Sequence, residues 1–174
     1  MTRSRALVLG LVAACLAGVG VHAEGAATAA SPAPCAAPEH RQFDFWLGNW
    51  KVADRDGKPE GTNDVTLEFG GCVLVEHWKG ARGMTGSSFN AYDATRKVWH
   101  QTWVDDRGTL LLLEGGIAGG KMVLEGPGRG AKGEAVLNRI SWERLPDGRV
   151  LQLWTVSSDG GATWATSFEG YYGK

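Results

Sequence analysis

The chain has 174 residues, a length that suits one domain with a single hydrophobic core. Its 18 basic and 19 acidic residues give a formal net charge of −1, and no basic stripe runs along the sequence. This balance argues against nucleic acid or an anionic membrane surface as a partner. The CxxC and HxxxH spacings of metal sites are also missing, so we expect no metal and no cofactor.

Residues 1–23 have the layout of a secretory signal peptide. Arg3 and Arg5 supply a positive start, a run of small and apolar residues follows, and Ala23 ends a small-x-small cleavage site. The apolar run is shorter than the roughly 20 residues that a membrane-spanning helix needs. We therefore expect export with cleavage near Ala23, so that the mature protein is secreted or periplasmic. An uncleaved anchor and a lipoprotein processed at Cys15 are the alternatives.

Residues 24–38 are rich in Ala, Pro, Ser and Thr. Such a segment buries too little apolar surface to offset the entropy of ordering, so it is predicted to be a disordered tether. The folded domain is predicted to span 39–174 and to begin with one or two helical turns over 39–47. Cys35 and Cys72 remain after cleavage, and in an oxidising compartment such a pair suggests one disulfide. Two buried thiols are the alternative.

From Trp50 onward the sequence indicates short strands joined by tight turns. Turn pairs such as Asp56-Gly57 and Gly160-Gly161 separate runs rich in Val, Leu, Thr, Trp and Phe. We expect about ten strands, at 48–54, 63–69, 72–79, 86–92, 97–105, 109–116, 121–126, 134–144, 149–157 and 163–171. So many strands in a short chain favour closure, which removes exposed edges. The predicted fold is therefore all-β: a closed or nearly closed antiparallel up-and-down barrel with a short N-terminal helical turn. An immunoglobulin-like sandwich is the alternative, although its Cys–Trp–Cys spacing is missing.

The string FDFWLGNW at 43–50 contains Gly48 and Trp50 in a Gly-x-Trp pattern. This pattern resembles the signature at the first strand of lipocalins and other calycins. Together with segments 76–78, 99–105 and 157–164, the string resembles a family of secreted bacterial lipocalin-like proteins of unknown function. The resemblance covers residues 43–172 and implies a calycin-type barrel with a cavity, in which Gly48 and Trp50 are structural. It implies no ligand class, because calycin barrels bind lipids, retinoids or haem.

Side-chain alternation gives each strand two faces. One face of the strands between 72 and 105 carries polar and aromatic side chains: Glu76, Trp78, Asn90, Tyr92, Gln101, Trp103 and Asp105. Later strands add Arg139, and Trp154 together with Gln152, to this face. Large rings exposed to solvent would be unusual, so we expect this face to line the lumen. The opposite face then carries His77 and His100.

These residues predict an exported small-molecule-binding barrel that holds an amphipathic or aromatic ligand in its lumen and needs no catalysis. The rings of Trp78, Tyr92, Trp103 and Trp154 would stack on the ligand. Its orientation would come from Glu76, Asn90, Gln101 and Asp105. Arg139 would pair with the buried carboxylates, which need a counter-charge.

Three alternatives remain. An enzyme would use Glu76 and Asp105 as an acid–base pair, because adjacent inward carboxylates split their pKa values. An envelope structural or interaction protein would have a lumen filled by its tryptophans. Haem binding would need His77 or His100 as the axial ligand, and hence the opposite face turned inward.

One stretch near the C-terminus matches the Asp-box pattern S-x-D-x-G-x-T-W in full, at Ser157, Asp159, Gly161, Thr163 and Trp164. Sialidase-like propellers carry one such box per blade, but this chain has one copy and is too short for a propeller. We therefore expect the box to be structural and to stabilise a single hairpin turn through side-chain bonds to the turn backbone.

Overall fold

The computed structural model describes residues 34–174, so the predicted signal peptide, Cys15 and most of the predicted tether lie outside the described residues. Two short 3-10 helices, η1 (Pro38–Arg41) and η2 (Asp44–Trp46), come before the strands, as expected for 39–47. A third, η3 (Phe69–Gly71), separates the second and third strands. The strands are β1 (Gly48–Ala53), β2 (Pro59–Glu68), β3 (Val73–Gly80), β4 (Thr85–Asp93), β5 (Val98–Asp105), β6 (Leu110–Ala118), β7 (Lys121–Arg129), β8 (Ala135–Arg144), β9 (Val150–Ser157) and β10 (Ala165–Gly173).

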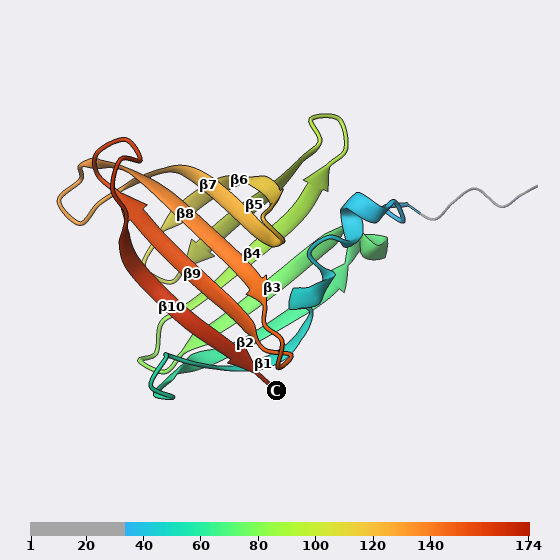
Figure 1. The fold of residues 1–174 in the computed structure, drawn as a ribbon, viewed down its shortest axis with the longest axis horizontal. Coiled ribbons are helices and arrows are strands. Elements are labelled where there is room, and N and C mark those ends of the chain that lie inside the picture. Colours follow the sequence, from blue (N-terminus) through green and yellow to red (C-terminus); the bar gives the residue numbers. More distant parts are fainter. Residues whose placement is uncertain (1–33) are drawn as a thin grey trace, which may run out of the picture. The chain divides into compact units, whose positions relative to one another are not determined.

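The ten strands form a closed barrel in which each strand pairs antiparallel with the next along the chain (Figure 1). The seam is made by β1 and β10, where Val52 lies opposite Tyr172. This arrangement confirms the predicted fold class, and the sandwich alternative is wrong. Closure satisfies the backbone groups that an open sheet would leave at its edges.

The predicted strand positions are confirmed, with notable differences at two strand ends. Strand β7 continues to Arg129 rather than ending at residue 126, and β2 differs at its start. The strand begins at Pro59 rather than at residue 63. Residues 59–62 have the composition of a turn, but Thr62 pairs with Lys51 of β1 and with Lys79 of β3. Pairing with β1 and β3 therefore makes residues 59–62 part of the sheet, although their own propensity for strand is low.

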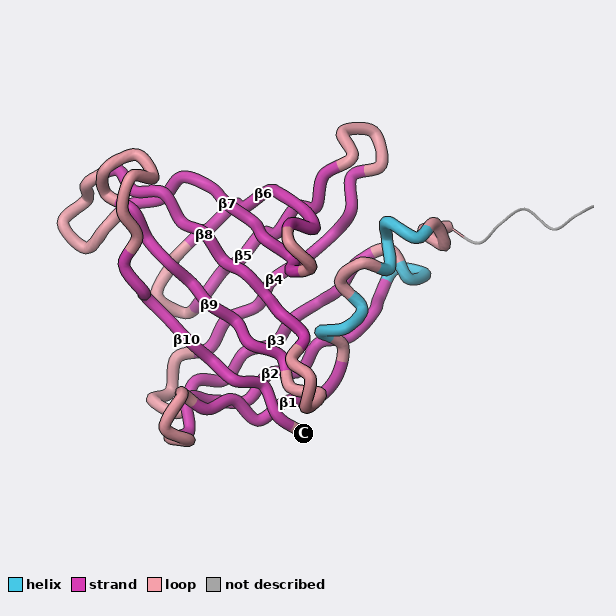
Figure 2. The backbone as a smooth tube through the Cα atoms, in the orientation of Figure 1, coloured by secondary structure: helices cyan, strands magenta, loops and turns pink. Residues whose placement is uncertain are grey.

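The up-and-down connection gives the barrel two different ends (Figure 2). One end carries η1, η2, η3 and the C-terminal end of β10. The other end, which we call the mouth, carries the loops 54–58, 81–84, 106–109, 130–134 and 158–164.

Aromatic side chains fill the lumen at the end opposite the mouth. We call this group the aromatic plug: Phe43, Trp46, Trp50, Trp99 and Trp142, all buried. The Phe43 ring stacks on Trp46 with 5.0 Å between centroids and meets Trp142 edge-on, also at 5.0 Å. The Trp50 indole N–H donates to the Trp46 carbonyl oxygen at 2.8 Å, which ties β1 to η2. Rings in these arrangements gain stability beyond the area they bury.

A disulfide between Cys35 and Cys72 joins the segment before η1 to the start of β3, as predicted. The Arg41 guanidinium adds a hydrogen bond to the Gly71 carbonyl oxygen and an ion pair with Asp44 at 3.4 Å. The first described residues are thus fastened to the plug end of the barrel. Within residues 34–174, no helix has the length and apolarity to cross a membrane.

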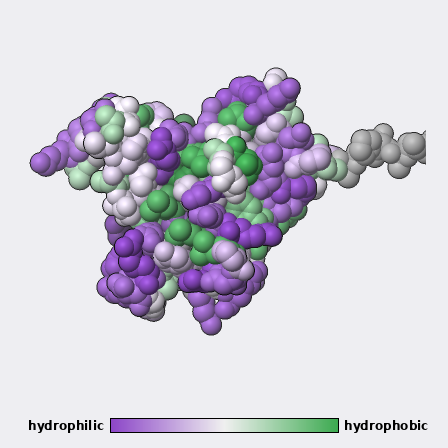
Figure 3. Space-filling model, in the orientation of Figure 1, coloured by the Kyte–Doolittle hydropathy of each residue, from purple (hydrophilic) through white to green (hydrophobic). Residues whose placement is uncertain are grey.

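Figure 3 shows hydrophobic residues among hydrophilic ones on the face where β8 and β9 lie in front, and other outward apolar residues lie on β4 to β6. Several large apolar side chains point outward from the barrel wall, including Leu110 at 62% exposure and Phe89 at 48%. Phe89 lies opposite Thr102, and Thr102 lies opposite Leu112, so β4 to β6 carry an apolar row on their outer face. This row is separate from the lumen, because lumenal side chains occupy the alternate positions.

Candidate functional site

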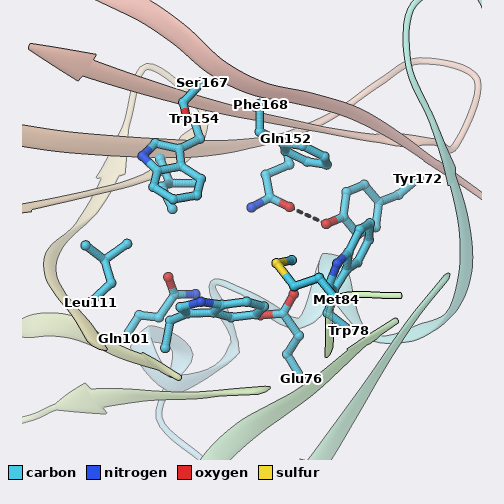
Figure 4. A pocket seen from close by; sticks show the side chains of 12 residues that line it. Glu76, Trp78, Met84, Gln101, Leu111, Gln152, Trp154, Ser167, Phe168 and Tyr172 are labelled. Carbon is cyan, nitrogen blue, oxygen red and sulfur yellow. Dashed lines mark hydrogen bonds between the residues drawn. The ribbon is translucent and has the colours of Figure 1, made fainter. Parts of the chain in front are cut away.

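The half of the lumen nearer the mouth contains a cavity of about 200 Å³. Its wall is mainly aromatic and aliphatic, with a few polar groups: Glu76, Trp78, Met84, Gln101, Trp103, Leu111, Ile140, Gln152, Trp154, Ser167, Phe168 and Tyr172. Figure 4 shows Glu76 and Gln101 entering from one side and Gln152 and Trp154 from the opposite side. An apolar wall with few polar groups is typical of small-molecule sites, although this cavity is smaller than drug-sized pockets.

Two strand glycines make room for the indoles on the cavity wall. A Cβ atom at Gly86 would lie 2.4 Å from the Trp103 ring, and one at Gly61 would lie 2.7 Å from the Trp78 ring. Each indole therefore packs over the neighbouring strand at its glycine, where there is no side chain to block the ring. The glycines fix how far the rings extend into the lumen.

Glu76 is the acidic residue of the cavity wall, and its side chain is 4% exposed. Its two carboxyl oxygens accept hydrogen bonds from Asn63 Nδ2 and Ser88 Oγ, both at 2.6 Å. Burial raises the pKa of Glu76 to about 7, and the bonds from Ser88 and Asn63 counteract part of this rise. The wall contains no Lys, Arg or His, and no ion pair involves Glu76 among the described residues.

Hydrogen bonds extend from Glu76 along β4 and β5. Asn90 Nδ2 donates to Ser88 Oγ at 2.9 Å, and Gln101 Nε2 donates to Asn90 Oδ1 at 2.7 Å. The Gln101 amide nitrogen is thus engaged behind the wall. Its oxygen, Oε1, is left free for the cavity.

The network also extends from Glu76 toward β9 and β10. Asn63 Nδ2 lies 3.4 Å from the Tyr172 oxygen, and the Tyr172 hydroxyl donates to Gln152 Oε1 (Figure 4). The Gln152 oxygen is occupied, so its NH₂ group is available to the cavity. Asn63 Oδ1, beside Glu76, is a buried acceptor with no partner among the described residues. The hydrogen bonds of this chain orient the amide groups of Asn63 and Gln152.

Of the predicted ligand-binding residues, the cavity wall contains Glu76, Trp78, Gln101, Trp103 and Trp154. Asn90 is fully buried but stands behind the wall, where it also donates to the Leu74 carbonyl oxygen at 3.2 Å. Tyr92 packs near the plug, 6.0 Å from Trp99 between ring centroids. Neither residue reaches the cavity.

Two predicted positions are corrected by the structure. Arg139 lies on the outer face, where its Nε donates to Glu125 at 2.6 Å and its guanidinium stacks 3.9 Å over Trp164. It does not pair with Glu76. On β8 the side chains that point into the lumen are those of Asn138, Ile140 and Trp142. The register of β8 with β7 and β9 sets this choice of face.

Asp105 stands at the last position of β5 and does not join Glu76. Its carboxylate accepts from the backbone N–H groups of Arg107 and Thr109, at 3.0 and 2.9 Å, and so holds the β5–β6 turn. These bonds lower the pKa of Asp105 against a rise from burial. The acid–base pair of the enzyme hypothesis therefore lacks its second carboxyl group.

The two strand histidines point away from the lumen. His77 Nδ1 lies 3.0 Å from Ser87 Oγ, and His100 contacts Thr102 and Glu114 at 2.8 and 3.3 Å. An axial haem ligand inside the barrel would require the opposite face to point inward, so neither histidine can serve there. A lumen filled throughout is also wrong, because the plug occupies one half and the cavity the other.

Sequence reasoning missed several cavity residues: Met84, Leu111, Ile140, Ser167, Phe168 and Tyr172. It placed Gln152 on the same face as Trp154 but not among the ligand-binding residues. Alternation could have found Tyr172, which shares a face with Phe168. Ser167 follows no alternation, because the register of β10 shifts between Thr166 and Phe168. Met84 belongs to a loop, so no strand pattern points to it.

The Asp-box residues form one hydrogen-bonded turn between β9 and β10. Asp159 accepts from the Thr163 N–H at 2.9 Å and from the Thr163 hydroxyl at 2.6 Å. The Gly161 N–H donates to Ser157 Oγ at 2.8 Å, and Trp164 Nε1 donates to the Gly161 carbonyl oxygen at 3.0 Å. The two bonds from Thr163, with a third from the Ser157 hydroxyl, pull the pKa of Asp159 well below its ordinary value. The turn sits at the mouth, outside the cavity wall.

At the other end of the lumen, Gly48 begins β1 with φ at +135°, a backbone conformation that favours glycine. Two residues later, Trp50 fills the plug and lies under the Lys174 ammonium, 4.4 Å from the ring centroid. The Gly-x-Trp pattern thus stands where the chain enters the barrel.

Comparisons of the sequence with models of protein families and with curated proteins found no match.

Proposed function

We propose that this protein is an exported small-molecule-binding barrel of the lipocalin-like kind, which holds an amphipathic or aromatic ligand in its lumen without catalysing a reaction. The observation that carries the proposal is the cavity of about 200 Å³ at the mouth half of the barrel. The other half is closed by the aromatic plug, so the ligand enters and leaves through the mouth. Export rests on the sequence of residues 1–23 and accords with the disulfide.

The wall of the cavity suits binding because its polar groups are oriented before the ligand arrives. Tyr172 and Asn90 hold the amides of Gln152 and Gln101, and rigid rings form the remaining wall. Little side-chain entropy is then lost on binding, which favours affinity. The same wall offers one carboxyl group and no nucleophile–base pair, so binding is the function that it supports best.

The methionine methyl groups provide a direct test in solution. Met84 lines the cavity, whereas Met122 is fully buried in β7 away from it. With ¹³C-methyl methionine, titration of the mature protein with benzyl alcohol should move the Met84 signal and leave the Met122 signal in place. Benzyl alcohol is a neutral aromatic probe small enough for the cavity.

Native mass spectrometry of the protein purified from its own envelope extends the test to the physiological ligand. We expect a co-purifying small molecule that is released on unfolding. The proposal is overturned if no such molecule is found and if the Met84 methyl signal fails to respond to benzyl alcohol. Absorbance in the Soret region of the same sample would instead identify haem and contradict the geometry of His77 and His100.

A further inference from the structure

The charge inside the cavity points to a ligand class. Glu76 brings a carboxyl group into a wall that has no Lys, Arg or His. Both hydrogen bonds to it come from neutral donors, Asn63 and Ser88. A carboxylate has about four acceptor sites, so these two bonds leave acceptor capacity unused. A buried ionised carboxylate without a counter-charge is costly, and a cation supplied from outside would remove that cost.

The surrounding rings favour the same kind of ligand. Three indoles, from Trp78, Trp103 and Trp154, line the cavity together with Phe168 and Tyr172. The face of an aromatic ring carries negative charge density and attracts cations, most strongly when water is excluded. A positive group next to Glu76 would therefore meet favourable electrostatics from the carboxylate and from the rings.

Acceptors are also available for the hydrogens of a protonated amine. Gln101 Oε1 faces the cavity, because its amide nitrogen is engaged by Asn90. An ammonium group carries up to three N–H donors, so a wall that presents acceptors suits it. The Gln152 NH₂ group offers the complementary donor for a hydroxyl or carbonyl elsewhere in the ligand.

Size sets the remaining limit. The cavity measures about 200 Å³, somewhat more than the roughly 150 Å³ in which an engineered protein cavity binds benzene. One aromatic ring with a short side chain fits this volume, whereas a fatty acid or a tetrapyrrole does not.

We infer that the cavity binds a small organic cation, an ammonium group carried on a single aromatic ring or a comparable apolar group, with Glu76 as its counter-ion and Trp78, Trp103 and Trp154 around it. The inference rests on the proposed binding function and specifies its ligand. Selection of the cation follows from one carboxylate, so a neutral ligand of the same shape should bind more weakly and an anionic one most weakly.

Three probes of nearly equal shape test the inference: benzylamine, benzyl alcohol and benzoate. Titrations of the mature protein at about pH 8 are followed through the Met84 methyl signal, because Glu76 is then ionised while an alkylamine stays protonated. Benzylamine should bind at least about tenfold more tightly than benzyl alcohol, as expected for a hydrogen bond to a charged group. Benzoate should bind more weakly than either.

The variant Glu76→Gln keeps the shape of the side chain and removes its charge. In this variant the affinity for benzylamine should fall until its preference over benzyl alcohol is near unity. Glu125→Gln is the matched control, because it removes a carboxylate on the outer face, where Glu125 pairs with Arg139, and leaves the cavity wall intact, so it should retain the preference.

A pH series on the wild type makes the test independent of any variant's folding. Tyr172 is the other titratable group that faces Glu76 in the described barrel, and burial holds its pKa well above the ordinary value, so it stays neutral. The remaining groups around the cavity from β2, β4, β5 and β9 are amides, a serine and two indoles, none of which titrates in this range. Benzylamine affinity should therefore fall by about tenfold or more from pH 8 to about pH 5, as Glu76 takes up a proton, while benzyl alcohol affinity stays level.

The outcomes separate the two proposals. Equal affinity for benzylamine and benzyl alcohol, tighter binding of benzoate, or an unchanged preference in Glu76→Gln would overturn the cation inference and leave the binding function standing. If none of the three probes moves the Met84 signal, the binding function fails for ligands of this size, and the cation inference fails with it.

Discussion

Folding moves the Glu76 side chain from water into the cavity wall, where no positively charged side chain lies beside it. Its hydrogen bonds to Asn63 and Ser88 keep it positioned, but burial still raises its pKa to about 7. An acid whose pKa is higher in the folded state than in the unfolded state binds its proton more tightly when folded. Its contribution to stability is therefore present at low pH and is lost as the pH rises.

The variant Glu76→Gln should reveal this dependence. Between the ordinary value of 4.5 and about 7, the unfolded wild type ionises while the folded protein keeps the proton. The wild type should thus lose a few kcal/mol of unfolding free energy, relative to the variant, as the pH rises through this window. Urea unfolding of both proteins at matched pH values measures the difference. If the unfolding free energies of the two proteins change in parallel with pH, Glu76 does not titrate in this window.

At the residue scale, alternation predicted which side of β3, β4 and β5 carries the polar and aromatic groups, Glu76 and Trp103 among them. Alternation gave the wrong face for Arg139. Both faces of β8 carry polar residues, so the register with the neighbouring strands decides which face points inward. The pair that Arg139 makes with Glu125 is set by the alignment of β7 with β8. For Asp105, side-chain alternation did not indicate that a carboxylate at the end of a strand would accept hydrogen bonds from backbone N–H groups of the following turn.

At the scale of the elements, strand glycines determine where the cavity rings lie. Gly86 on β4 is opposite Asp105 on β5, and the Trp103 ring lies across it. Any side chain at Gly86 would meet the Trp103 ring at 2.4 Å and the Val104 carbonyl oxygen at 2.9 Å. The ring could move only into the lumen, because the sheet occupies the other side.

We therefore expect Gly86→Ala to destabilise the protein by about 1–3 kcal/mol, the usual cost of overpacking, and to weaken benzyl alcohol binding by narrowing the cavity. Gly116→Ala is a matched control on a strand of the same barrel, since a Cβ atom there has nothing within 4 Å. The control should stay within about 0.5 kcal/mol of the wild type. Equal effects of the two substitutions on thermal unfolding and on binding would contradict the role given to Gly86.

The elements themselves were predictable because glycine-rich turns separate strands that are dense in β-branched and aromatic residues. The start of β2 was not, since residues 59–62 are held by β1 and β3 rather than by their own propensity. Met84 and Ser167 were likewise beyond sequence reasoning. One lies in a loop, and the other follows a register shift in β10, so their approach to the cavity depends on the closed barrel.

In the whole molecule, the two ends of the barrel have different structural roles. The plug end is packed with rings and joined to the N-terminal segment by the disulfide, whereas the mouth end surrounds the cavity. Closure could be predicted from the number of strands and the chain length. The division into a filled half and an open half could not, because it depends on how far Phe43 and the following η2, with Trp46, extend into the lumen.

This division predicts that the disulfide supports stability and leaves binding unchanged. Cys72 comes just before β3 and Met84 just after it, so the disulfide and the cavity entrance are about 25 Å apart. Replacing Cys35 and Cys72 together by Ser releases a crosslink over 37 positions of the sequence, which should lower the unfolding free energy by about 2–4 kcal/mol. Benzyl alcohol affinity, measured through the Met84 methyl signal while both proteins are folded, should not change. A variant that loses affinity in proportion to its stability would show that the plug end and the cavity behave as a single unit.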